Sequence, residues 1–255
     1  MAYIKKETRA GDRIRIEKYY SSRYGSKGRS VRAENFNKTP AEMKRRNLRY
    51  AKMKADDIFC ENFKAGDLTI TFTFTPEKRP KNTAELKIVW QKYIRQARSA
   101  YKKAGKTFRW MKGIDISKNN PHIHAAFTSI DIKLLPKWKY GKIHINPIDD
   151  REHHTFGAYL VQQGVPIDEK KQQLEGESLF SYSHSRNCII PQPKITIISN
   201  DHWCDEPRAP QGWIIVKDSL QNWHDEYNGY RHQSYLIIKI PTCNKRRSRC
   251  DYSGA

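Results

Sequence analysis

The sequence lacks the features of a membrane protein, an exported protein or an ATP-driven enzyme. No stretch of its 255 residues approaches the roughly 20 consecutive apolar residues that a membrane span needs, and no apolar signal core stands near its N-terminus. No G-x-x-x-x-G-K-[ST] pattern for nucleotide phosphates is present. We therefore expect a soluble protein of the cytoplasm that does not contact a membrane.

Cysteine is scarce and irregularly spaced. The chain has five cysteines, an odd number, and no C-x-x-C pair: Cys60, Cys188, Cys204, Cys243 and Cys250. Their spacing indicates neither a zinc site nor redox chemistry. We expect reduced thiols.

Acidic residues are few compared with basic ones. The chain has 27 Asp and Glu but 48 Lys and Arg, which gives a formal charge of +21. Such an excess favours a polyanionic partner, above all nucleic acid. A ribosome-associated or simply basic protein shares this property, and the charge says nothing about catalysis.

The chain divides by composition into three parts. Residues 1–37 predict a basic, flexible arm with a short strand or hairpin at best, residues 38–199 the main domain, and residues 200–255 an extension with a basic tail. A helix begins at Thr39-Pro40, where a capping residue precedes proline at the first helical position. Three arginines crowd this helix and form either a solvated face or a DNA contact: Arg45, Arg46 and Arg49.

Hydrophobic periodicity predicts an α+β fold around an antiparallel sheet. Strict alternation over 68–75 predicts a strand, and apolar residues at helical spacing over 83–104 predict a long helix. Segments 108–117 and 121–128 predict an antiparallel hairpin, and residues 155–163 a second helix. Short apolar runs at 195–199, 213–216 and 235–240 can add strands.

His122-Ile123-His124 lies in the second strand of the predicted hairpin, so both imidazoles project from one face. An H-x-H pair alone is more typical of a structural role than of a metal site. Asp115 on the partner strand, however, falls on the same face. Two imidazoles and a carboxylate form a mixed nitrogen and oxygen ligand set that suits Mg²⁺ or Mn²⁺.

Three segments, in order, resemble the motifs of the HUH endonuclease superfamily, specifically its rolling-circle replication initiators of plasmids and filamentous phages. They are 62–73 (NFKAGDLTITFT), 121–124 (PHIH) and 158–163 (AYLVQQ). Ser185-Arg186-Asn187 followed by Pro191 resembles a further signature of the group. The resemblance implies a central sheet with helices packed on one face and the metal and tyrosine site on the other.

The resemblance also implies the chemistry. Tyr159 attacks a phosphodiester of single-stranded or hairpin DNA at a replication origin, with Mg²⁺ or Mn²⁺ held by His122, His124 and Asp115. The products are a 5′-phosphotyrosyl bond and a 3′-hydroxyl that primes synthesis in a bacterial cytoplasm. Because the phosphotyrosyl bond conserves the energy of the broken phosphodiester, no ATP is required. The expected partners are a host helicase and polymerase.

The motif departs from the family pattern at two positions. Gln162 replaces a lysine three residues after the tyrosine, and Gln163 stands where two-tyrosine members carry the second tyrosine. The second departure favours a one-tyrosine mechanism. Outside the motifs, Tyr182 and Arg186 are candidates for base stacking and phosphate pairing with DNA.

Rival interpretations remain open. A conjugative relaxase or a single-tyrosine transposase would use the same atoms, although many mobilisation relaxases place the tyrosine before the histidines, whereas Tyr159 follows them. A non-catalytic protein that binds an origin without cutting it is the alternative from another class, and Gln162 favours it. His144 and the pair His153-His154 indicate surface or DNA contact more than metal binding.

Overall fold

The computed structural model describes residues 2–21, 24, 39–115, 121–149, 155–163, 182–199, 202–224 and 229–240. The chain forms two compact units. We call Thr8–Gly11 and Lys27–Pro193 the α+β unit, and Met1–Glu7, Asp12–Ser26 and Lys194–Ala255 the β unit. The α+β class is confirmed, but two antiparallel sheets replace the single central sheet that the sequence predicts.

The α+β unit contains a five-stranded antiparallel sheet in the order β6-β3-β5-β4-β7. Its strands are β3 (Leu68–Phe72), β4 (Trp110–Asp115), β5 (His122–Phe127), β6 (Ile143–Pro147) and β7 (Ser183–His184). The predicted strand at 68–75 and the predicted hairpin are confirmed with shorter bounds. The sequence did not predict strands β6 and β7.

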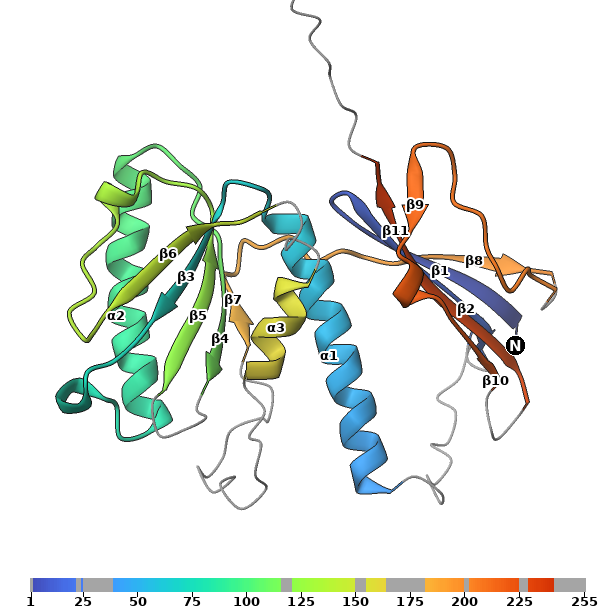
Figure 1. Ribbon diagram of the computed structural model, residues 1–255, viewed down its shortest axis with the longest axis horizontal. Coiled ribbons are helices and arrows are strands. Elements are labelled where there is room, and N and C mark those ends of the chain that lie inside the picture. Colours follow the sequence, from blue (N-terminus) through green and yellow to red (C-terminus); the bar gives the residue numbers. More distant parts are fainter. Residues whose placement is uncertain are drawn as a thin grey trace, which may run out of the picture. The chain divides into compact units, whose positions relative to one another are not determined.

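Helix α2 (Thr83–Lys103) covers one face of this sheet (Figure 1). The helix begins where the Asn82 side chain accepts a hydrogen bond from the Glu85 backbone at 2.8 Å. Its apolar stripe meets the alternating apolar residues of the strands and forms the larger core of the unit. The fully or nearly fully buried members include Ile70, Phe72, Trp90, Tyr93, Ala97, Tyr101, Ile123, Ala125 and Phe127.

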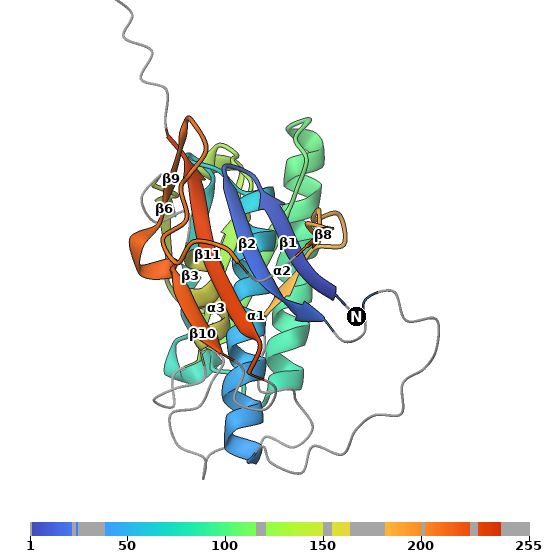
Figure 2. The ribbon, with the colours of Figure 1, turned by 90° about the vertical axis from the view of Figure 1, so that its right-hand side faces the viewer.

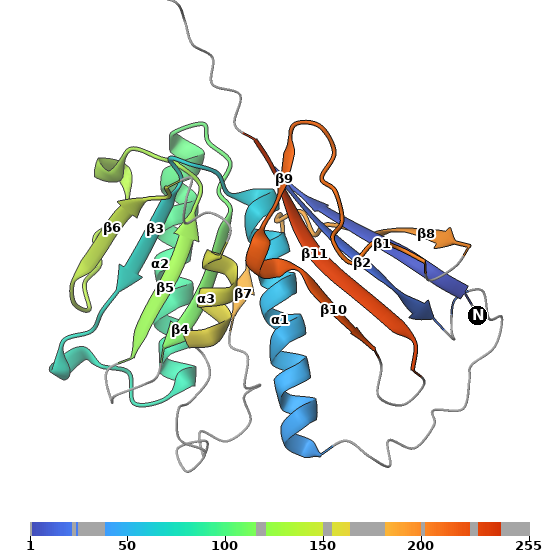
Figure 3. The same cartoon turned by 45° about the vertical axis from the view of Figure 1, so that its right-hand side comes forward.

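Helices α1 (Pro40–Asn62) and α3 (Phe156–Gln163) lie on the other face (Figure 3). The predicted start of α1 at Thr39-Pro40 is confirmed, and the structure adds a capping box, in which Thr39 and Glu42 bond to each other's backbone N–H. The expectation that helices occupy one face only is wrong. Met111 and Ala126 make one end of the second face apolar, and α1 and α3 bury it.

Two buried polar side chains, Asn62 and Asp67, hold the turn that joins α1 to β3. Both belong to segment 62–73, which resembles the first motif of the superfamily. Asp67 accepts hydrogen bonds from the backbone of Ser129 at 2.7 Å and of Lys64 at 3.0 Å. The Asn62 amide bonds to both the N–H and the C=O of Ile189 at 2.7 Å. These residues therefore have a structural role, which fixes where β3 begins.

The β unit is a sheet in the order β10-β11-β2-β1-β8, with β9 paired to β11 (Figure 2). Its strands are β1 (Ala2–Ala10, of which residues 8–10 count with the α+β unit), β2 (Arg13–Ser21), β8 (Lys194–Ile198), β9 (Trp213–Ile215), β10 (Gln221–His224) and β11 (Arg231–Lys239). The flexible arm predicted for residues 1–37 is therefore a strand pair over residues 2–21; apart from residue 24, residues 22–37 lie outside the described residues. The expected boundary at 199/200 differs from the observed division, because β8 already belongs to the β unit.

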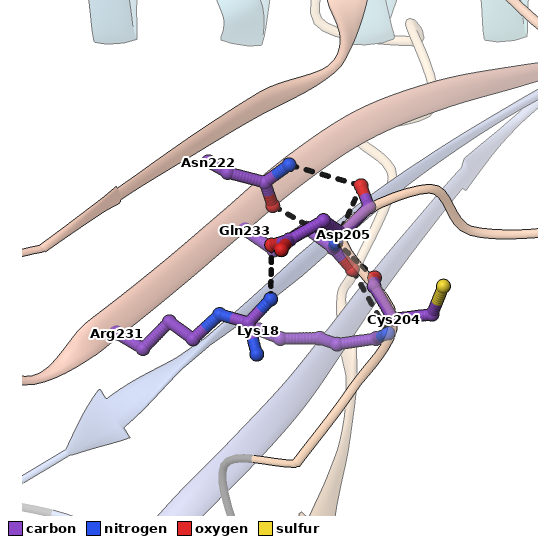
Figure 4. A network of polar contacts seen from close by, with 6 residues as sticks. All are labelled: Lys18, Cys204, Asp205, Asn222, Arg231 and Gln233. Carbon is purple, nitrogen blue, oxygen red and sulfur yellow. Dashed lines mark hydrogen bonds and ion pairs between the residues drawn. The ribbon is translucent and has the colours of Figure 1, made fainter.

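A buried glutamine links the strands of the β unit to the segment that precedes β9 (Figure 4). Gln233 is 1% exposed, donates to the carbonyl of Cys204 at 2.8 Å and to Asn222 Oδ1 at 2.9 Å, and accepts from Lys18 Nζ at 3.0 Å. Arg231 also donates to the carboxylate of Asp205. Both the amide nitrogen and the amide oxygen of Gln233 therefore have hydrogen-bond partners within the protein.

The thiols of Cys60, Cys188 and Cys204 are free, as the sequence predicts, while Cys243 and Cys250 lie outside the described residues. None of the helices in the described part of the chain combines the length and the apolarity needed to cross a membrane.

Candidate active site

The two predicted metal-binding histidines lie side by side on the sheet face opposite α2. In the register of β4 and β5, His122 pairs with Asp115 and His124 pairs with Gly113. The imidazole rings are nearly parallel at 16°, with centroids 6.3 Å apart. The prediction that Asp115 shares a face with both histidines across the hairpin is confirmed by this register.

His124 is held between a strand and a helix. From β3, Thr71 Oγ1 lies 3.2 Å from His124 Nδ1. From α3, the Tyr159 hydroxyl lies 3.4 Å from Nε2 and 3.5 Å from Nδ1, and the two rings meet edge to face with centroids 5.2 Å apart. The structure therefore brings together the histidine, the threonine and the tyrosine, which are distant in sequence.

Two close backbone contacts set the position of α3. Gly113 on β4 lies directly against the backbone of Leu160, and Gly157 lies against the backbone of Ala55 and Asp56 on α1. Neither position has room for a Cβ. At the start of α3, the Asp56 carboxylate accepts a hydrogen bond from the Ala158 backbone at 2.6 Å, which places a negative charge at the positive end of the helix. Tyr159 follows one residue later.

Burial determines the protonation of the site. Burial is the main cause that lowers the pKa of His124; Asp115 opposes it, and the neighbouring His122 adds a smaller lowering effect. At neutral pH the imidazole is therefore uncharged, as a metal ligand or proton acceptor requires. Burial and the negative charge of Asp115 raise the pKa of Tyr159, so its hydroxyl carries its proton at neutral pH. The phenol needs activation before it can attack a phosphate.

The side chains on this face provide some, but not all, of the ligands that a divalent ion needs. His124 is neutral, and the hydroxyl of Thr71 beside Nδ1 is the kind of second partner that orients a ligating imidazole and leaves Nε2 for a metal. Within the described residues, however, no three His, Cys, Asp or Glu side chains gather closely enough to hold one ion. The two imidazoles are the ligands that the geometry supports best, and Asp115 stands across from only one of them.

His144 belongs to the same face, although the sequence did not assign it to the site. It pairs with Thr71 in the register of β3 and β6, so His124, Thr71 and His144 form one row across three strands. Its side chain is exposed. The alternation of Ile143, His144, Ile145 and Asn146 was the available signal, but the segment is too short to reveal its partner strand.

The remaining predicted site residues are placed differently. Gln162 lies on α3, but its side chain is outside what the structure describes. Tyr182 is half-buried against the core beneath α3, and burial raises the pKa of its hydroxyl, so part of its ring serves packing. His153 and His154 lie outside the described residues.

The predicted DNA-contacting arginines are all exposed. Arg45, Arg46 and Arg49 lie on α1, about 9–15 Å along the helix from the turn that contacts α3. Arg186 is exposed beside Ser185 and Asn187, which bond to the backbone of Trp110 and Phe108 respectively. The Ser-Arg-Asn segment therefore extends the β4 edge of the sheet and holds Arg186 there.

Comparisons of the chain with models of known families, with curated proteins and with solved structures find no match. A functional assignment therefore has to come from the chemistry of the site and from the resemblance of the motifs.

Proposed function

We propose that the chain nicks and rejoins single-stranded DNA through Tyr159, as a rolling-circle replication initiator does. The observation that carries the proposal is the 3.4 Å separation between the Tyr159 hydroxyl and His124, on a sheet face that also carries His122 and Asp115. A nucleophile beside metal-ligating side chains is the arrangement that such chemistry needs. The charge of +21 supplies attraction for a polyanionic substrate.

The reaction exchanges one ester for another. The Tyr159 oxygen forms a bond to phosphorus, the bond between phosphorus and the 3′ oxygen breaks, and the phenolic proton is lost while the departing 3′ oxygen gains one. A 5′-phosphotyrosyl bond and a 3′-hydroxyl result, and the reverse reaction rejoins the strand. His122 and His124, with Asp115 as the proposed third ligand, would hold Mg²⁺ or Mn²⁺, which when bound would supply polarisation of the scissile phosphate.

The chain's own residues supply positioning. The sheet fixes His122 and His124 on one face, Thr71 orients the His124 ring, and the close contact of α3 with Gly113 holds Tyr159 beside them. Such pre-organisation reduces the entropy that must be lost on reaching the transition state. The free 3′-hydroxyl would prime synthesis by a host polymerase, with unwinding by a host helicase, in a bacterial cytoplasm.

Two alternatives use parts of the same observations. A relaxase or a transposase would use the same atoms, and the order of histidines before tyrosine favours the initiator over many relaxases. An origin-binding protein that does not cut is favoured by Gln162 and by the lack of a third ligand gathered around the histidines in the described residues. The covalent intermediate distinguishes the last alternative from the others.

The test is to trap that intermediate. The full chain is incubated with Mn²⁺ and labelled single-stranded oligonucleotides that tile the DNA flanking its gene. We expect an adduct that survives denaturation and that mass spectrometry maps to Tyr159. Tyr159→Phe, which removes one oxygen and keeps the ring, should abolish the adduct and retain DNA binding, whereas the matched control Tyr182→Phe should form it normally.

An adduct that persists in Tyr159→Phe, or that maps to another tyrosine, contradicts the mechanism. No adduct on any oligonucleotide, with binding intact, would favour the origin-binding alternative.

A further inference from the structure

The α+β unit also has a groove on the face of the sheet opposite His122 and His124. The groove, of about 1080 Å³, lies between α2, strand β4 and the segment 183–187. Trp110 and Lys112 of β4 line it, whereas their neighbours Gly113 and Asp115 belong to the opposite face. One strand therefore contributes to both the candidate active site and the groove.

The groove is lined by cations. Seven of its lining residues are Lys or Arg, and none of the described lining residues is Asp or Glu. Along α2, the side chains of Lys87, Arg95, Arg98 and Lys102 recur at about one-turn or two-turn spacing. From Lys87 to Lys102 the row is about 22 Å long at 1.5 Å per residue. Such a row matches several successive negative charges and exceeds what one phosphate needs.

The buried wall of the groove supplies a second, independent observation. Trp90 is 4% exposed, and its indole nitrogen has no hydrogen-bond partner. The indole nitrogen of Trp110 is also buried without a partner. Both residues line the groove. The groove therefore has an aromatic wall beside its cations.

A buried lysine strengthens the same argument. Lys112 is 7% exposed, and its ammonium group lies 5.6 Å from the centre of the Trp90 ring. The π electrons of the Trp90 ring stabilise this cation at the wall of the groove. At the rim, exposed Arg186 adds a cation at the β4 edge. Cations therefore stand on the wall, along the helix and at the edge.

We propose that this groove binds the sugar–phosphate backbone of a single DNA strand, and this proposal rests on the proposed nicking function for the identity of its ligand. A single row of cations on one helix fits one backbone better than the two backbones of a duplex. The absence of carboxylates among the described lining residues indicates contact with phosphates and not recognition of sugar hydroxyls. The groove would hold DNA that flanks the segment at Tyr159.

The experiment compares two triple variants of equal charge change. Arg95→Ala/Arg98→Ala/Lys102→Ala alters the groove, and Lys81→Ala/Lys92→Ala/Lys103→Ala alters exposed lysines on or just before α2 that do not line it. The affinity for a labelled single-stranded 30-mer is measured for both with EDTA present, so that no cutting occurs. Circular dichroism checks that both variants are folded.

We expect the groove variant to bind at least tenfold more weakly than the control variant. The slope of log affinity against log salt should fall by about 2, because three phosphate contacts are lost at about 0.7 each for a single strand. Equal affinity in the two variants overturns the proposal. So does a loss that is seen with duplex DNA or RNA but not with the single strand.

Oligonucleotide length separates this proposal from the nicking function. With a six-nucleotide substrate that covers only the cleavage site, the groove variant should form the Tyr159 adduct at the wild-type rate, whereas with the 30-mer it should be slower at limiting DNA. If the wild type forms no adduct, the affinities measured in EDTA still show whether the groove binds DNA. If the groove variant is slowed equally on both lengths, the groove assignment is wrong and the nicking function stands.

Discussion

Gly113 lies directly beneath Leu160, so closely that a Cβ at residue 113 would come within 2.9 Å of the Leu160 carbonyl carbon. Gly113 is also the register partner of His124. The missing side chain thus allows the backbone of α3 to approach the strand beside the histidine. This contact explains how the tyrosine of α3 reaches His124.

Gly113→Ala should therefore push α3 away from β4. We expect a loss of about 1–3 kcal/mol in the free energy of unfolding, from overpacking. Adduct formation should fall at least tenfold, because Tyr159 moves relative to His124. Thermal unfolding and the adduct assay measure the two effects. A variant with wild-type stability and activity would show that α3 does not need this contact.

Thr71→Val tests whether the threonine orients His124. Valine has nearly the same shape but lacks the hydroxyl 3.2 Å from Nδ1. Loss of such a second partner typically weakens metal binding by about 10- to 100-fold. Titration with Mn²⁺ measures it. Thr69→Val is the matched control, because Thr69 lies on the same strand and face but bonds to the Asn146 carbonyl; equal affinities would remove Thr71 from the site.

Asp56→Ala removes the acceptor for the Ala158 backbone N–H. Loss of a side-chain cap costs about 1 kcal/mol, so we expect faster hydrogen exchange in α3 and slower adduct formation. Asp56→Asn retains an acceptor oxygen and should lie nearer to the wild type in both measurements. If asparagine is as damaging as alanine, the charge of Asp56 matters more than its hydrogen bond.

Gln162→Lys introduces the cation that the initiators resembled by the motifs carry three residues after the tyrosine. A positive charge near developing negative charge assists the reaction if residue 162 faces the site. We predict that the rate of nicking is unchanged or increased. Single-turnover kinetics with Mn²⁺ provide the measurement. A folded variant that no longer nicks would mean that residue 162 has a role outside the family pattern.

Gln233→Leu tests the polar network of the β unit. The substitution leaves the Lys18 ammonium, the Asn222 side chain and the Cys204 carbonyl without this partner. We expect a cost of about 1–3 kcal/mol in the β unit. Hydrogen exchange of β2, β10 and β11 should rise, whereas the exposed control Gln221→Leu should change little. No change in exchange would show that the network is dispensable.

Local patterns in the sequence determined most of the α+β unit. Strict alternation predicted β3, helical spacing predicted α2, and a capping residue followed by proline predicted where α1 begins. The alternation of side chains along the hairpin predicted that Asp115 shares a face with His122 and His124, and the register confirms it. All these features depend on neighbours within a few residues, which is why the sequence shows them directly.

Only the tertiary structure decided which residues that are far apart in the sequence contact one another. The sequence predicts strand character at 235–240, but not that β11 pairs with β2, where Lys18 and Gln233 are 215 residues apart. Likewise, the sequence predicts that Tyr159 lies on a helix. It does not show that Gly113, which lacks a side chain, allows this helix to pack beside His124. Such contacts depend on side-chain volume and on the closure of long loops, which no local periodicity encodes.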